Sequence, residues 1–166
     1  ALVCAGGLGD EVMPLLRERL PDANLLIVGR HPTPQVQELG RSPGVEVVGS
    51  VPDVRVYMQR SSAVIAPLQI ARGVQNKVLE AMACGTPVAA FPVTGPVDVL
   101  TPQGGAMDAD LGAAAAKALT LDRTQVAAFG QGFSWDESAD QFLAALYPAD
   151  GVRDDAQPMG SLAQVA

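Results

Sequence analysis

The chain has 166 residues, a net charge of −7, a hydrophobic fraction of 48% and an aromatic fraction of only 4%. This length suits one domain with its own core. The acidic balance, without any run of Lys and Arg, excludes the basic surface of a protein that binds nucleic acid or anionic membranes. No apolar stretch reaches the roughly 18 residues of a membrane-spanning helix.

The sequence offers little material for a metal centre or a catalytic triad. Cys4 and Cys84 form no CxxC or other metal-ligand pattern, so we interpret them as small buried apolar residues. His31 is the only histidine, which argues against a histidine metal site and against a Ser-His-Asp triad. The chain opens inside the apolar run "ALVCA" without an initiator Met, and we therefore expect it to be a piece of a longer protein.

Short apolar runs alternate along the chain with segments of helical periodicity. In chain order, the pattern predicts a strand at 1–5, a helix at 10–20, a strand at 23–29, a helix at 33–40, a strand at 45–49, a helix at 53–61, a strand at 62–68, a helix at 73–84, a strand at 87–92, a short strand at 104–107, and helices at 108–119, 122–130 and 135–146. We expect Asp53 to cap the start of its helix and Gly40 to stop the helix that precedes it.

Nearly all-apolar strands that alternate with helices are typical of a parallel sheet covered on both faces. The predicted fold class is α/β: a Rossmann-like, doubly wound parallel sheet of about six strands. Residues 1–148 would form this single domain. Residues 149–166 are polar and aperiodic, and we expect a loosely ordered tail there.

The loops that follow the strands are the places to look for a ligand, because open parallel sheets bind ligands beyond the carboxyl ends of their strands. Arg30 and Arg72 both fall in such loops. With the helix N-termini at the same edge, they would form a local anion site on an acidic protein. The alternative, that both arginines are simply solvated, stays open.

The helix predicted at 73–84 carries one polar stripe, made of Gly73, Asn76, Lys77, Glu80 and Cys84. Gly73 at its start would let a phosphate approach the free N–H groups. Glu80 follows about 10 Å further along the axis, where a carboxylate could accept hydrogen bonds from the hydroxyls of a ribose. The alternative is a Lys77–Glu80 pair on a solvated surface, and spacing alone slightly favours it.

The segment "RGVQNKVLEAMACGTPVAAF" resembles the donor-binding signature of retaining GT-B glycosyltransferases of the group 1 family, in which this helix ends "LEAMAxGxPVVA". The form "ARGVQNKVLEAMA", with "PDANLLIVGR", "GVEVVGSVPDVRVYM" and "VIAPL" before it, is similar to sugar transferases of bacterial exopolysaccharide and exosortase (PEP-CTERM) systems. The segment after residue 92, including "FSW", looks more like another branch of the same superfamily. The resemblance covers residues 14–92 best.

The resemblance implies a set of residues that bind a nucleotide-sugar donor. Glu80 matches the glutamate that binds the donor ribose. The implied contacts to the donor diphosphate and sugar are Arg72, Gly73, Val74 and Gln75, and those beside the nucleobase and ribose are Gly49, Val51, Pro52 and Arg30. Arg72 and Lys77 are the candidates for stabilising the leaving group.

Two departures from the family pattern concern the leaving group. The commoner pattern has two glutamates eight positions apart, and Arg72 stands where the first would be. Many members also carry a basic residue in the loop after the first strand, whereas "GGLGDE" has none. Stabilisation of the departing diphosphate therefore rests on other positive charges and helix-end N–H groups.

The activity that the resemblance implies is transfer of a sugar from a UDP- or GDP-sugar, with retention at the anomeric carbon, to a glycan or lipid-linked acceptor in exopolysaccharide or cell-envelope synthesis. It requires no cofactor and no obligatory metal. The acceptor would bind an N-terminal domain that this chain lacks, so we expect the chain alone to bind donor weakly and to transfer nothing. The expected location is the cytoplasm, with the missing domain as the means of any contact with the inner membrane.

Three alternatives remain open. A dehydrogenase is suggested by "GGLG", but the full GxGxxG is absent and Arg30 stands where an NAD site wants an acid. One half of a UDP-sugar 2-epimerase shares the GT-B architecture, although we find no acidic and histidine set for its chemistry. A non-catalytic nucleotide-binding or interaction module would account for both departures.

Overall fold

The computed structural model describes residues 2–4, 12–69 and 75–145. It contains one six-stranded sheet in which every neighbouring pair is parallel, in the order β3-β2-β1-β4-β5-β6. The strands are β1 (Leu2–Cys4), β2 (Leu25–Val28), β3 (Val45–Gly49), β4 (Ala63–Ala66), β5 (Val88–Ala90) and β6 (Gly105–Met107). All six predicted strands are present, most of them one to three residues shorter than predicted, and the predicted fold class is confirmed.

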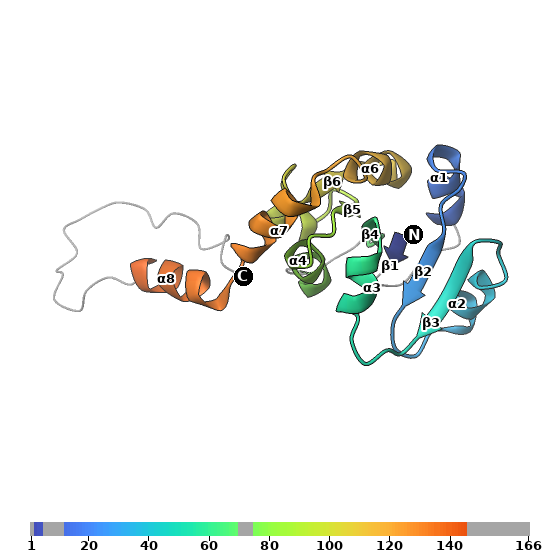
Figure 1. Ribbon diagram of the computed structural model, residues 1–166, viewed down its shortest axis with the longest axis horizontal. Coiled ribbons are helices and arrows are strands. Elements are labelled where there is room, and N and C mark those ends of the chain that lie inside the picture. Colours follow the sequence, from blue (N-terminus) through green and yellow to red (C-terminus); the bar gives the residue numbers. More distant parts are fainter. Residues whose placement is uncertain (1, 5–11, 70–74, 146–166) are drawn as a thin grey trace.

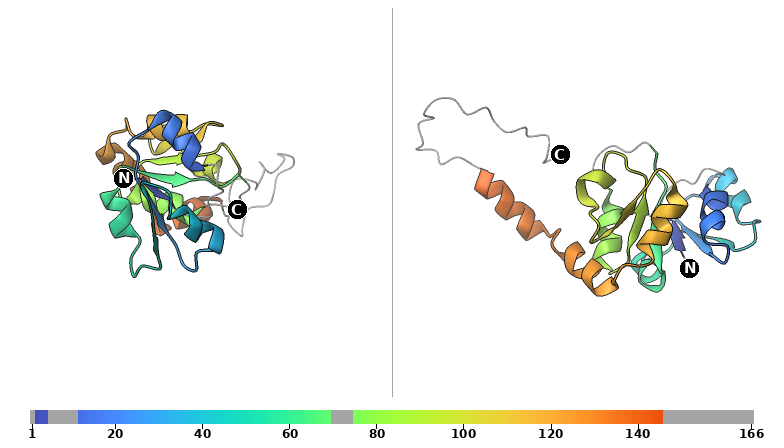
Figure 2. Two further views of the ribbon diagram at one scale, coloured as in Figure 1. Left: turned by 90° about the vertical axis from the view of Figure 1, so that its right-hand side faces the viewer. Right: turned by 90° about the horizontal axis from the view of Figure 1, so that it is seen from above.

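Helices cover both faces of this sheet (Figures 1 and 2). The helices are α1 (Val12–Arg19), α2 (Pro34–Leu39), α3 (Arg55–Arg60), α4 (Asn76–Ala83), α5 (Pro96–Val99), α6 (Leu111–Ala118), α7 (Arg123–Gln131) and α8 (Trp135–Ala145). Two core clusters lie on the two sides: α1, α2 and α6 pack on one, and α3, α4, α5 and α7 on the other. Helix α8 extends away from this body (Figures 1 and 2).

The side chains of each strand divide between the two clusters because successive residues of a strand point to opposite faces. Ile27 belongs to the cluster under α1 and α6, and Val28 to the one under α4. Ile65 and Val64 divide in the same way. This double burial is the reason that the strands are almost entirely apolar.

The structure corrects two local predictions and adds one helix that was not predicted. The N-cap of α3 is Val54 rather than Asp53, whose carboxylate instead accepts the backbone N–H of Arg55 at 2.9 Å. Helix α5 was not predicted, because four residues are too few to show a helical period. Helix α4 begins at Asn76 rather than at Gly73, which lies outside the described residues, as does the tail predicted at 149–166.

Helix α7 lies unusually close to α4. A Cβ added at Gly130 would clash with the backbone of Met82 and Ala83, so only glycine permits this approach. Helix α7 is thereby packed directly on the helix that carries the sequence signature. Its N-cap is Asp122, whose carboxylate accepts the backbone N–H groups of the two residues that follow Arg123.

The order of the strands reverses between β1 and β4, and in doubly wound folds ligands bind beside such a switch point. The loop after β1, residues 5–11, and most of the loop after β4, residues 70–74, fall outside the described residues. What can be described of the ligand edge is the carboxyl end of β2, the turn after β3, and α3 and α4. Among the described residues, no helix is long and apolar enough to span a membrane.

Candidate functional site

A hollow of about 450 Å³ opens at the carboxyl edge of the sheet. It lies between the end of β2, the turn after β3, α3 and α4. Six of the residues predicted for donor binding line it: Arg30, Gly49, Val51, Pro52, Lys77 and Glu80. The structure therefore brings together residues that are up to 50 positions apart in the sequence.

Glycine shapes the strand end of this hollow. Gly49 closes β3 with a φ of +76°, a left-handed conformation that glycine adopts without strain. The pairing of β2 and β3 shifts there, so that Gly49 stands opposite Val28 and its carbonyl accepts the N–H of Gly29 at 3.0 Å. Neither glycine has another atom within 4 Å of where a Cβ would stand, so the backbone is open to the hollow.

Helix α4 forms the opposite wall. Val78, Ala81 and Met82 are buried, while Lys77 and Glu80 are exposed, as the predicted stripe requires. The ion pairs among the described residues join Arg19 to Asp110, Arg41 to Glu38 and Arg55 to Asp53, and neither Lys77 nor Glu80 takes part in one. Both charges are thus held at the hollow without the surface pair that spacing alone favoured.

A third cation near this wall was missed by the sequence analysis. Asp53 holds the guanidinium of Arg55 through hydrogen bonds of 2.9 to 3.2 Å. The hydrogen bond from Arg55 lowers the pKa of Asp53, and the pKa of Arg55 is raised first by Asp53 and, to a lesser degree, by the carboxylate of Glu80. Arg55 therefore lies within electrostatic range of Glu80. The available signal was the Asp-x-Arg spacing at the helix start.

The N-terminus of α4 is the place predicted to meet phosphate. Its N-cap, Gln75, is half-buried and makes no side-chain cap, while its carbonyl accepts the N–H of Val78 at 2.8 Å. N–H groups in the first turn of a helix have no partner within the helix. Arg72, Gly73 and Val74, which were predicted to contact the diphosphate, lie outside the described residues.

A second hollow of about 320 Å³ adjoins the first, and Arg30 and Lys77 line both. It adds His31, which is exposed and has a φ of +52°. The two cations thus stand between two hollows at the carboxyl end of β2.

Cys84, predicted to be a buried apolar residue, is only half-buried at the C-cap of α4, and burial is the main cause that raises the pKa of its thiol.

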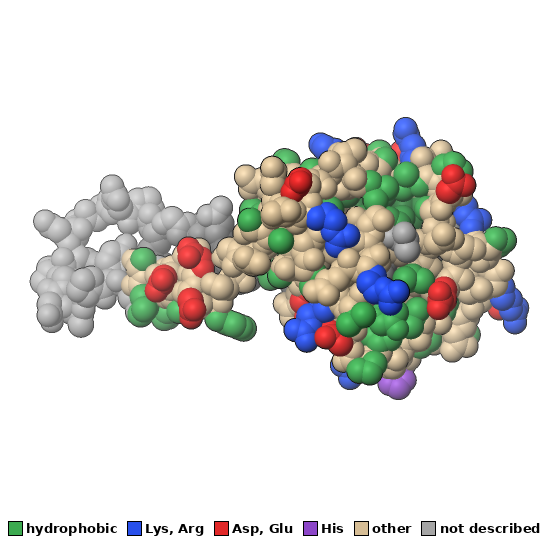
Figure 3. Space-filling model, viewed as in Figure 1, with side chains coloured by type: hydrophobic (Ala, Val, Ile, Leu, Met, Phe, Trp, Pro, Cys, Tyr) green, Lys and Arg blue, Asp and Glu red, His purple; other side chains and the backbone are tan. Residues whose placement is uncertain are grey.

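Another hollow, of about 620 Å³, lies on the far side of Glu80 between α4, α5 and the start of α8. Trp135 lines it with 91% of its surface exposed. On the face shown in Figure 3, basic and acidic side chains are interspersed over the body, whereas hydrophobic and acidic side chains lie together on α8.

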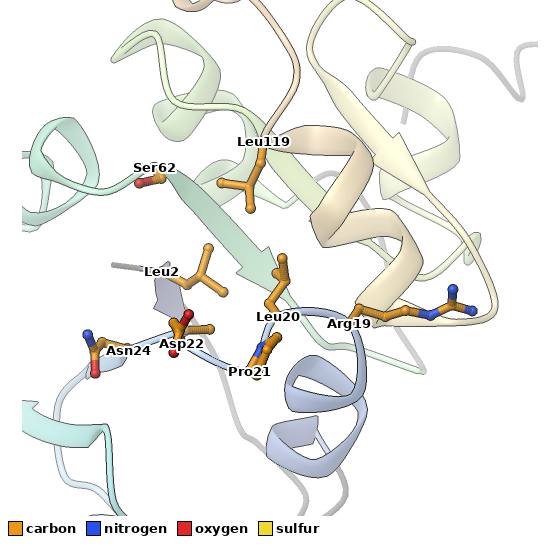
Figure 4. Close-up of a pocket in the computed structure, with 9 residues that line it drawn as sticks. Leu2, Arg19, Leu20, Pro21, Asp22, Asn24, Ser62 and Leu119 are labelled. Atoms are coloured by element: carbon orange, nitrogen blue, oxygen red, sulfur yellow. The ribbon is translucent and has the colours of Figure 1, made fainter.

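The opposite edge of the sheet has a hollow of a different kind, with a volume of about 290 Å³ (Figure 4). Leu2, Leu20 and Leu119 converge there, and the side chain of Arg19 turns its guanidinium away from them (Figure 4). That guanidinium donates instead to Asp110 at 2.9 Å. Among the described residues that line this hollow, the only cation is therefore already paired, and the rest of the lining is largely apolar.

A family profile for glycosyl transferases group 1 matches residues 8–122, more than half of the chain. The chain belongs to this family. The carboxyl-edge hollow thus falls within the part that defines the family. No curated protein matches the chain.

Solved structures share the fold of this group 1 chain at low sequence identity. Anabaena HepE in complex with UDP has 18% identity and a TM-score of 0.64, over 87% of this chain and 48% of that one. The pneumococcal O-GlcNAc transferase GtfA, with UDP and GlcNAc, has 18% identity and a TM-score of 0.64, over 86% and 34%. AviGT4, a glycosyltransferase of avilamycin A biosynthesis, has 21% identity and a TM-score of 0.62, over 86% and 48%.

The chain spans half or less of the length of these structures. They agree with the predicted α/β architecture as one half of a GT-B fold. Family membership favours a glycosyltransferase over the dehydrogenase alternative. Within the described residues, no three His, Cys, Asp or Glu side chains cluster as metal ligands would.

Proposed function

We propose that this chain is the donor-binding, C-terminal domain of a retaining glycosyltransferase that uses a UDP- or GDP-sugar. The observation that carries the proposal is the convergence of Arg30, Lys77 and Glu80 with the turn from Gly49 to Pro52 on one hollow. A volume of about 450 Å³ lies within the range of small-molecule sites. UDP is the first choice because HepE and GtfA were solved with UDP.

In this proposal each wall of the hollow holds one part of the nucleotide. Val51 and Pro52 pack against the base, and Glu80 accepts hydrogen bonds from the ribose hydroxyls. Lys77 and the N–H groups at the start of α4 face the diphosphate, together with Arg72 through Gln75. These groups stabilise the negative charge that develops on the departing nucleoside diphosphate, without an obligatory metal or a cofactor.

The proposal extends to the whole enzyme. An N-terminal domain, absent from this chain, would bind a glycan or lipid-linked acceptor in exopolysaccharide or cell-envelope synthesis in the cytoplasm. The chain alone would bind donor nucleotide weakly and transfer no sugar. The exopolysaccharide assignment is supported by the "ARGVQNKVLEAMA" form of the signature.

Calorimetric titration of the chain with UDP, GDP, ADP and NADP tests the proposal. We expect UDP or GDP to bind with a millimolar or lower Kd, and NADP to bind more weakly. Binding of NADP alone would exclude a glycosyltransferase donor site.

A second candidate is a nucleotide-binding or interaction module without activity, and the presence of Arg72 at the position of the first family glutamate favours it. The full-length gene product separates the two candidates. Hydrolysis or transfer of a UDP-sugar by that protein supports the enzyme, and tight UDP binding without turnover supports the module.

A further inference from the structure

The short helix α3 owes its position to contacts from outside itself. It has six residues, too few for a helix to be stable alone, and its N-cap makes no side-chain hydrogen bond. Yet its residue Met58, together with Val54 just before it, lines the carboxyl-edge hollow opposite Lys77 and Glu80. Whatever holds α3 against α4 therefore sets the width of the hollow.

Arg123, near the start of α7, reaches across to the C-terminal ends of both helices. Its Nη1 donates to the carbonyl of Ser61 at 2.7 Å and its Nη2 to that of Gln59 at 2.9 Å. Its Nε donates to the carbonyl of Gly85, just after α4, at 3.0 Å. A guanidinium presents several donors in a rigid fork, and a helix C-terminus attracts positive charge, so arginine suits this place.

A buried hydroxyl extends the contact to the wall of the hollow. Nη2 of Arg123 also donates to Oγ1 of Thr86 at 3.0 Å, and this hydroxyl donates to the carbonyl of Met58 at 2.8 Å. Among the described residues, Ser61 and Thr86 are the buried polar residues: Thr86 joins this network through its hydroxyl and Ser61 through its carbonyl, while the Ser61 hydroxyl donates to the carbonyl of Tyr57 at 2.7 Å. Such groups are held firmly because a lost partner leaves a buried polar atom unpaired.

We infer that Arg123 is a positioning residue of the nucleotide hollow: from α7 it joins the C-terminal ends of α3 and α4 and so fixes the wall with Met58 relative to the wall with Glu80. The inference rests on the proposed function. Arg123 itself touches no ligand. Helix α7 is a firm base for it, because Gly130 packs directly on the backbone of α4.

The test compares UDP affinity with thermal stability in matched variants. Arg123→Ala should lower Tm and raise the Kd for UDP about tenfold, the size expected for coupling between residues in one network. Arg123→Lys keeps the positive charge but not the forked guanidinium. Its Tm and its Kd for UDP should lie between those of the wild type and those of Arg123→Ala. Leu111→Ala, which opens a cavity in the core on the other face of the sheet, should lower Tm at least as much and leave the Kd within about twofold.

A smaller change covers the case in which Arg123→Ala does not fold. Thr86→Val keeps the shape of the side chain and removes the hydroxyl between Arg123 and Met58, and it should raise the Kd about threefold. All titrations run at a temperature where circular dichroism shows each variant folded. If Arg123→Ala and Thr86→Val both bind UDP with the wild-type Kd, the inference about Arg123 is overturned while the proposed function stands. If Arg123→Ala does not fold, a wild-type Kd of Thr86→Val has the same consequence. A wild-type chain that binds no UDP would overturn the proposed function and this inference with it.

Discussion

The two edges of the sheet each carry a hollow, but they offer different chemistry to a ligand. At the amino edge, Leu20 and Leu119 supply apolar surface, and the cation Arg19 is already paired with Asp110 at 2.9 Å. At the carboxyl edge, Lys77 and Glu80 face the hollow and belong to none of the ion pairs found among the described residues. Uncommitted positive charge, rather than concavity, marks the candidate site, because the described lining of the amino-edge hollow holds the free carboxylate of Asp22 but no unpaired cation.

The largest expected effect comes from Glu80→Gln. The amide keeps the size of the side chain but replaces the carboxylate that, in the proposed binding mode, accepts hydrogen bonds from both ribose hydroxyls. The Kd for UDP should therefore rise about tenfold to a hundredfold. Calorimetry measures the change. Glu46→Gln, on an exposed residue of β3, is the control and should leave the Kd unchanged. If Glu80→Gln and Glu46→Gln bind UDP with equal affinity, the charge of Glu80 does not contribute to nucleotide binding at the carboxyl edge.

The next effect concerns the two lysines of the chain, Lys77 and Lys117, which form a natural pair for comparison. Lys77→Ala should raise the Kd for UDP about fivefold and leave that for uridine unchanged, because the ammonium group faces the diphosphate in the binding mode that we propose. The difference should shrink as salt is added. Lys117→Ala, in the last turn of α6, should change neither Kd. An equal loss for uridine would show that Lys77 does not act through phosphate.

A smaller effect concerns the stability of the sheet and its helices, to which Asp110 at the N-cap of α6 contributes. Asp110 accepts the N–H of Ala113 and pairs with Arg19, and these bonds, the one from Ala113 first, hold its pKa below the ordinary value. A lowered folded pKa stabilises the fold above the unfolded pKa of about 3.9, and this contribution is lost as the pH falls through the folded pKa.

Asp110→Ala should therefore lower Tm at pH 7, and its difference from wild type should shrink below about pH 4. Calorimetric melts from pH 7 to pH 2 measure this. Asp22→Ala, at a carboxylate that belongs to none of the ion pairs found among the described residues, is the control at pH 7 and should lower Tm by less. A constant gap for Asp110→Ala would contradict the assignment.

The smallest expected effect is at the amino edge. Leu119→Ser makes this hollow more polar at a half-exposed position, and the Kd for UDP should stay within about twofold of the wild-type value. The measurement is the same titration. A tenfold loss would mean that the amino edge takes part in nucleotide binding after all.

The sheet could be predicted because parallel strands buried on both faces must be apolar throughout, as the neighbours Ile27 and Val28 show. Helix α5 could not, because its four residues follow Gly95, whose φ of +100° and hydrogen bond from its N–H to Asp98 are turn chemistry rather than a repeating pattern. Local sequence shows periodicity well and short turns poorly.

The site divides in the same way. Arg30, Lys77, Glu80 and the turn from Gly49 to Pro52 could be placed together because the carboxyl ends of parallel strands share one edge. Arg123 could not be found, since its partner Ser61 is 62 residues away and only the packing of α7 on α4 brings them together. Arg55 was missed although its partner Asp53 is only two residues away. Its relevance to the site comes from Glu80, which lies 25 positions later in the chain and which only the fold brings near it.

Trp135 is the only tryptophan of the chain, and it stands almost fully exposed at the start of α8. The fluorescence of the chain therefore comes from an indole in contact with water and does not depend on the packing of the core. Emission from the native chain should already be red-shifted and should change little when the sheet melts. Conversely, a blue shift of the emission would show directly that another molecule, or another part of the enzyme, had covered the start of α8.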